Sequence, residues 1–139
     1  MSRHAPRLRR SVANDPLRVV CLVQAAYYVA TGIWPLVSPR SFQAVTGPKR
    51  DVWLVQTVGV LVGVVGTSLA LAAGRDRTHG TSPIRALALG SALGLAAVDV
   101  VFVARGRISR IYLADAAAEL GLVSAWLAPA ATRRVPRST

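Results

Sequence analysis

The chain has 139 residues, of which 53% are hydrophobic, and its 17 lysines and arginines against six acids give a net charge of +11. This length corresponds to one domain, and a mean hydropathy of +0.43 with the charges gathered in short segments is typical of a membrane protein. The basic residues lie in tails, loops and first turns of helices rather than on one face with aromatics, so we predict no nucleic-acid partner. One cysteine and two histidines, none arranged as a ligand set, predict no metal and no cofactor.

The N-terminal part joins a basic segment to an apolar run. Residues 1–16 carry four arginines and two prolines without an apolar period, which predicts a basic tail. The run 17–37 is longer than the apolar part of a usual signal peptide, and no A-x-A motif follows it, so we predict a first transmembrane helix. One face of this helix carries four polar or aromatic residues: Gln24, Tyr27, Thr31 and Trp34.

The next segment leads into a second span. Ser38-Pro39 has the pattern of a helix start and Gly47-Pro48 that of a stop, so we predict a short helix lying in the membrane interface. Asp51 is the candidate N-cap of the second span, 52–73. This span carries a polar residue on the same side as a glycine ridge: Gln56 with Gly59, Gly63 and Gly66.

The third span, 84–104, carries its small residues and its acid on opposite faces. At 100° per residue, Asp99 lies about 140–180° from the glycines of this span. Because a carboxylate facing lipid is costly, we predict that Asp99 faces the interior and that the small residues face outward. This small-residue ridge predicts a homo-oligomer contact through Ala86, Gly90, Gly94 and Ala97.

A basic turn, 105–110, precedes the fourth span, 111–128, and a basic tail, 129–139, follows that span. The fourth span carries a stripe of polar and aromatic residues: Tyr112, Asp115, Glu119 and Trp126. The predicted fold is therefore all-α, an integral membrane antiparallel four-helix bundle over residues 17–128.

Three of the six acids lie inside apolar runs: Asp99, Asp115 and Glu119. A helical hairpin would place Asp99 and Asp115 at similar depth, about 8 Å inside the flanking arginines, with Glu119 one turn deeper. In a structural interpretation, these acids are hydrogen-bonded to Gln56, Tyr27 or Tyr112, or paired with arginines. In a functional interpretation, they are catalytic candidates. The ligand-binding candidates are Gln24, Tyr27, Gln56, Asp99, Tyr112, Asp115 and Glu119.

The distribution of basic residues predicts the orientation in the membrane. An even number of spans places both tails on one side, which carries eleven lysines and arginines, whereas the other side carries six. By the positive-inside rule, we predict a multi-pass protein of the cell (inner) membrane with both termini in the cytoplasm.

Two runs, YYVATGIWPLVSPRSFQAVTGPKRDVWLVQTVG and ISRIYLADAAAEL, resemble a set of small four-helix bacterial membrane proteins and, more loosely, the DoxX-like group. The similarity covers about residues 17–127, and the stretch TGPK-x-D-x-W-L-V is its most specific part. The resemblance implies a four-helix bundle in the inner membrane and brings no catalytic residue with it.

We therefore expect a non-enzymatic membrane protein, either an accessory subunit of a partner membrane protein or a protein that binds a lipid or another apolar ligand. The first alternative is an intramembrane acid–base enzyme, of isomerase or hydrolase type, that uses Glu119 or Asp115. The second alternative is a proton-coupled transporter that acts as an oligomer. Membrane lipids are the expected partners in each case.

Overall fold

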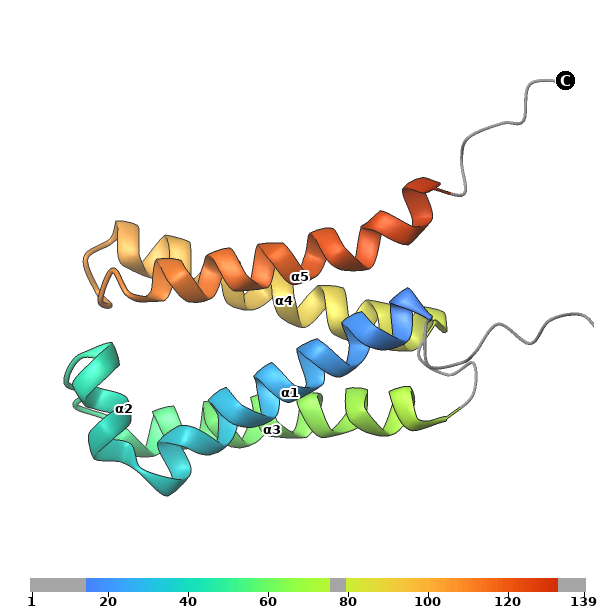
Figure 1. Cartoon of the computed structure of the whole chain (residues 1–139). Coiled ribbons are helices and arrows are strands. Elements are labelled where there is room, and N and C mark those ends of the chain that lie inside the picture. Colours follow the sequence, from blue (N-terminus) through green and yellow to red (C-terminus); the bar gives the residue numbers. More distant parts are fainter. Residues whose placement is uncertain (1–14, 76–79, 133–139) are drawn as a thin grey trace, which may run out of the picture.

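The computed structural model describes residues 15–75 and 80–132, and every regular element in these ranges is a helix (Figure 1). The elements are α1 (Pro16–Val37), α2 (Pro39–Thr46), α3 (Val52–Gly74), α4 (Ser82–Ala104) and α5 (Tyr112–Thr132). The all-α prediction is confirmed. Most of the two predicted tails, 1–16 and 129–139, lies outside the described residues. Helix α1 begins within the N-terminal tail, at Pro16, and α5 continues into the C-terminal tail, to Thr132.

Local sequence signals account for several helix ends. The Asp15 side chain accepts a hydrogen bond from the backbone N–H of Leu17 at 3.1 Å and so caps α1, whose first residue is a proline. The short helix α2 begins directly after Ser38, also with a proline, and ends at Thr46, directly before Gly47. Gly47 has φ of +88°, a backbone conformation that favours glycine, so the predicted stop is confirmed.

Three described helices are long and apolar enough to cross a membrane: α1, α3 and α4. This result agrees with the predicted membrane protein. The fourth long helix, α5, has 21 residues but carries Asp115 and Glu119 within its first half, and it does not belong to that group.

The long helices form two pairs. Helix α1 packs along α3, and α4 packs along α5, whereas contacts between the pairs are sparse and involve mainly α1 and α5 (Figure 1). Helix α2 and the α4–α5 turn lie at one end of the molecule. The start of α1 and the end of α5 lie at the other end.

The α1–α3 pair is held at close range by glycines. A Cβ atom added to Gly32 would lie 2.6 Å from the carbonyl oxygen of Gly59 and 2.7 Å from the nitrogen of Gly63. A Cβ atom added to Gly66 would lie 2.8 Å from the Cβ of Tyr28. The two backbones therefore approach more closely than any larger side chain allows, which is how small residues favour helix association in a membrane. We call this contact the glycine interface: Gly32 of α1 with Gly59, Gly63 and Gly66 of α3.

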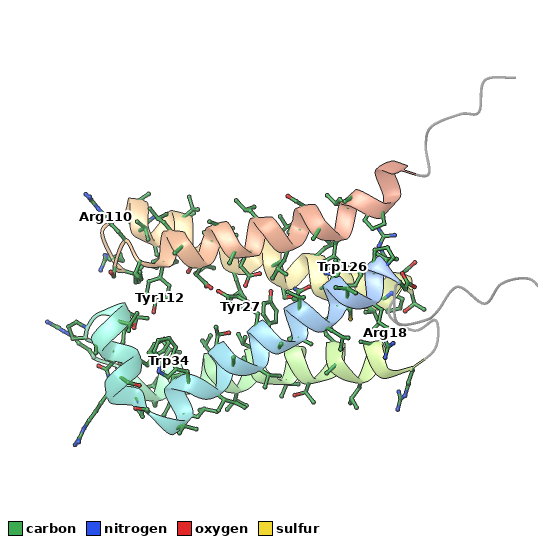
Figure 2. The ribbon with its side chains drawn as sticks, in the orientation of Figure 1. Arg18, Tyr27, Trp34, Arg110, Tyr112 and Trp126 are labelled. Carbon is green, nitrogen blue, oxygen red and sulfur yellow. The ribbon has the colours of Figure 1, made fainter. Side chains whose placement is uncertain are left out.

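The hydrophobic core lies toward the end of the molecule that holds the start of α1. It contains residues from all four long helices: Cys21, Ala25, Leu69, Ala73, Ala88 and Trp126. Arg18 reaches across this end, where its Nε donates a hydrogen bond to the carbonyl oxygen of Ala73 at 3.0 Å. Figure 2 shows Arg18 and Trp126 at this end.

Helix α4 has the two faces that its sequence predicts. Asp99 is only 6% exposed. The small-residue ridge, Ala86, Gly90, Gly94 and Ala97, is exposed, and no atom lies within 4 Å of a Cβ added to Gly90 or Gly94. The predicted orientation of α4 is therefore confirmed within the single chain.

Candidate functional site

Polar side chains gather where α1 faces the α4–α5 pair. On α1, Gln24 lies three and four residues before the two tyrosines, so all three side chains point to one side of the helix. On α5, Glu119 lies four residues after Asp115 and one face also carries Trp126. We call this region the polar interface: Gln24, Tyr27 and Tyr28 of α1, Asp99 of α4, and Asp115, Glu119 and Trp126 of α5.

At the core end, one amide joins three helices. The indole Nε1 of Trp126 donates to the Gln24 Oε1 at 2.7 Å, and the Gln24 Nε2 donates to the carbonyl oxygen of Ala88 at 2.9 Å. Both Gln24 and Trp126 are 0% exposed. Because buried polar groups are costly unless they are hydrogen-bonded, this paired arrangement holds α1 against α4 and α5.

A tyrosine–carboxyl hydrogen bond lies further along. The hydroxyl of Tyr28 donates to the Glu119 Oε2 at 2.8 Å, and both side chains are 1% exposed. Glu119 is thus a buried acid with a defined protein partner, and that partner comes from a segment 91 residues away in the sequence.

The third part of the polar interface contains two acids. The hydroxyl of Tyr27 donates to the Asp115 Oδ1, and the side chain of Asp115 in turn interacts with the carboxyl of Asp99. The Asp99 Oδ2 is buried and has no hydrogen-bond partner among the residues that the structure describes. An unsatisfied buried acceptor is costly and calls for an explanation.

A group of aromatic residues and one lysine lies between the acids and the α2 end, and we call it the rim: Trp34, Lys49 and Tyr112. The Lys49 Nζ lies 4.8 Å from the centre of the Tyr112 ring, a cation–π distance, and donates to the carbonyl oxygen of Thr46 at 3.1 Å. Figure 2 shows Trp34 and Tyr112 pointing toward one another from the two helix pairs.

Burial changes along the polar interface. Tyr28, Glu119, Trp126 and also Asp99 are buried, whereas Tyr27 and Asp115 are only partly buried. The interface is therefore closed at the core end and more accessible toward the rim. A separate shallow hollow lies where the end of α1, helix α2 and the start of α3 meet. Its lining includes Pro35, Phe42 and Val55 but none of the three acids.

The structure brings together five of the seven predicted ligand-binding residues: Gln24, Tyr27, Asp99, Asp115 and Glu119. Tyr112 lies at the rim beneath Lys49. Gln56 lies on α3, and within the described ranges no hydrogen bond joins it to the three acids. Of the predicted hydrogen-bond partners for the acids, Tyr27 is confirmed.

The alternative prediction, that arginines pair with the acids, is not what the structure shows. Arg110 is exposed and points away from the helices (Figure 2). In the described part of the chain, no salt bridge joins an arginine or lysine to Asp99, Asp115 or Glu119.

Two partners escape the sequence prediction. Tyr28 is the partner of Glu119, and Trp126 is the partner of Gln24. The signal for Tyr28 was present, because a residue four positions after Gln24 lies on the same helix face. No sequence pattern pairs Gln24 with Trp126, since 102 residues separate them.

In the ranges 15–75 and 80–132, no group of three or more His, Cys, Asp and Glu side chains is arranged to hold a metal ion. The models of protein families, the curated proteins and the solved structures compared with this chain give no match. The resemblance to the DoxX-like group therefore stays a prediction.

Proposed function

We propose that this chain is a multi-pass protein of the cell membrane that crosses the bilayer four times and binds a lipid-like or other apolar ligand between its two helix pairs, without catalysing a reaction. The observation that carries the proposal is the polar interface itself. Each helix pair packs closely, but the pairs meet across a line of polar groups that is more accessible at the rim. One buried carboxyl oxygen on that line has no donor among the described residues.

The proposal includes α5 as the fourth span. Its 21 residues extend about 31 Å at 1.5 Å per residue, which matches the hydrocarbon thickness of a bilayer. Its two acids are turned toward α1 and α4, where they meet Tyr27, Tyr28 and Asp99. Its outer face instead exposes three leucines at seven-residue spacing: Leu113, Leu120 and Leu127. A helix that carries two acids thereby acquires a lipid-compatible outer surface.

The proposed orientation places both termini in the cytoplasm, with α2 and the α4–α5 turn on the far side. The support is the excess of basic residues on the terminal side, eleven against six, and the presence of the two connections at one end of the molecule (Figure 1). Topology reporters fused after Thr139 and within α2 test the orientation. A C-terminal reporter that is active only outside the cytoplasm contradicts it.

We further propose that two copies associate through the small-residue ridge of α4, which is exposed and has open space around its glycines. The variant Gly90→Leu with Gly94→Leu is expected to lose a cross-linked dimer and to keep its membrane insertion. Gly121→Leu is the matched control, because this glycine of α5 is also exposed with nothing near its Cβ position. Equal loss in the control, or no loss in the ridge variant, rejects the ridge as the contact.

The binding function is tested on the full chain purified from membranes in a mild detergent. Native mass spectrometry is expected to show an apolar molecule retained by the protein and released chemically unchanged. Asp99→Asn is expected to reduce its retention, whereas Asp51→Asn, at an exposed acid before α3, is the control. Release of a chemically altered molecule would support the acid–base enzyme instead, and the absence of any retained molecule contradicts the proposal.

A further inference from the structure

The polar interface contains an uncompensated set of acidic groups. Asp99, Asp115 and Glu119 interact electrostatically with one another. In the described ranges none of them forms an ion pair with a lysine or arginine. Carboxyl groups in a membrane usually meet a partner of opposite charge, a proton or a ligand. A ligand that brings positive charge would therefore gain more here than a neutral one.

One carboxyl oxygen of the polar interface lacks a hydrogen-bond donor among the described residues. The Asp99 carboxyl interacts with the side chain of Asp115, and its Oδ2 is buried without a hydrogen-bond partner among the described residues. Asp99 as a whole is 6% exposed, so water has little access to that oxygen. A ligand N–H group would satisfy it by a charge-assisted hydrogen bond, the stronger kind.

The surroundings suit an organic cation with an apolar part. Tyr27 borders the two aspartates, and the rim adds the rings of Trp34 and Tyr112. The Tyr112 ring already holds an ammonium group, that of Lys49, over its face at 4.8 Å. Aromatic rings attract cations through their electron-rich faces and also pack against apolar groups.

We propose that the ligand of the polar interface is an amphipathic organic ammonium, whose N–H donates to the Asp99 Oδ2 and whose apolar part lies between the helix pairs toward the rim. This inference rests on the proposed apolar-ligand function and names the ligand class for it. An inorganic cation fits less well, because in the ranges 15–75 and 80–132 no side-chain group of the metal-holding kind exists.

The proposal implies competition between the ammonium and protons. The titratable groups that face Asp99 are Asp115 and Glu119 from α5 and Tyr27 from α1. Protonation of the carboxyls removes the negative charge that attracts the ligand, so binding is expected to weaken as the pH falls. A neutral ligand would lack this dependence.

The experiment compares phenylbutylammonium with phenylbutanol, which has the same apolar part and no charge. The full chain is held in nanodiscs of phosphatidylcholine, whose headgroup has no N–H donor, and empty nanodiscs correct for partition into lipid. The ammonium is expected to bind at least about tenfold more tightly than the alcohol, the size expected for a charged hydrogen bond. Asp99→Asn is expected to abolish this preference, and Asp51→Asn to preserve it.

A second arm separates two sources of the ammonium. Nanodiscs that contain phosphatidylethanolamine are expected to weaken probe binding if a lipid headgroup occupies the site, and to leave it unchanged if the natural ligand is a free amine. Either result retains the ammonium class. Helix content and unfolding of Asp99→Asn, measured by circular dichroism, show whether this variant keeps its fold. If Asp99→Asn does not keep its fold, the test is made on the unmodified chain instead. This chain is then expected to lose its preference for the ammonium over the alcohol at low pH.

The outcomes distinguish this inference from the proposed function. If the alcohol binds as tightly as the ammonium, and neither Asp99→Asn nor pH changes the ratio, then the ammonium class is wrong and apolar binding stands. If neither probe binds above the level of empty nanodiscs, the ammonium proposal is wrong. The proposed function falls as well only when native mass spectrometry finds no retained apolar molecule.

Discussion

Helix α1 contacts α3 through the glycine interface and contacts α4 and α5 through the polar interface. In the first, backbone lies against backbone, with a Cβ added to Gly59 only 2.6 Å from the carbonyl oxygen of Gly32. In the second, long side chains bridge the helices through hydrogen bonds from Gln24, Tyr27 and Tyr28. Helix α1 is thus held by close backbone packing on one side and by side-chain hydrogen bonds on the other.

The two contacts differ in how rigidly they hold the helices and in how much space they leave for a ligand. Close glycine packing gains dispersion contacts along the whole length of a helix pair and leaves no room for a ligand. Side-chain bridges hold helices further apart and localise the stabilisation in a few atoms. A ligand site is therefore expected at the polar interface, and the glycine interface is expected to act as its fixed support.

The largest effect is expected from Gly59→Ala. The new methyl would meet the carbonyl oxygen of Gly32 at 2.6 Å and the Pro35 ring at 2.9 Å, so the backbones must separate. We expect a loss of about 3 kcal/mol in the free energy of unfolding, measured by denaturant titration in mixed micelles.

The control for this prediction lies one turn further along α3. Gly63→Ala points its methyl into open space, so it is expected to be neutral or to stabilise by up to about 1 kcal/mol through helix propensity. Equal destabilisation by the two alanines would show that the α1–α3 contact is not a close glycine contact.

A smaller loss, about 2 kcal/mol, is expected from Tyr28→Phe. The change leaves the buried Glu119 Oε2 without its 2.8 Å donor. Adding Glu119→Leu to it is expected to recover part of the loss, because an apolar pair has no unsatisfied group. A double-mutant cycle measures this coupling, and strictly additive losses would show that the two side chains do not stabilise each other.

Tyr27→Phe is expected to cost less, about 1 kcal/mol, because Tyr27 and Asp115 are only partly buried and water replaces the lost donor. The comparison with Tyr28→Phe measures the gradient of burial along the polar interface. If the two phenylalanine variants unfold alike, the rim end is as closed as the core end.

The smallest effect is expected from Glu119→Gln, less than about 1 kcal/mol. The amide oxygen of glutamine has the same position and accepts the same hydrogen bond from Tyr28. Thermal unfolding in detergent checks this value. A loss of several kcal/mol would mean that the negative charge of Glu119, rather than its oxygen, stabilises the helix contact.

Patterns within single segments were enough to predict the helices and the orientation of one of them. Proline after a capping residue and a glycine stop predict both ends of α2, because these residues act through backbone geometry within one or two positions. The inward direction of Asp99 follows from its angle to Gly90 and Gly94 and from the cost of a carboxylate in lipid. The gathering of Tyr27 with Asp115 was also among the expected contacts.

Tertiary structure decided which faces meet and which acids find partners. Tyr28 meets Glu119, and Gln24 meets Trp126, only because α1 and α5 run antiparallel in one particular register. The paired residues are 91 and 102 positions apart, so no local sequence pattern predicts this register. Gly59 and Gly66 of α3 turned toward α1, while Gly90 and Gly94 of α4 turned outward, although both helices carry small residues at four-residue spacing. Small residues permit a close approach without specifying the partner, whereas the buried acids of α4 and α5 must face protein, and this requirement orients those helices.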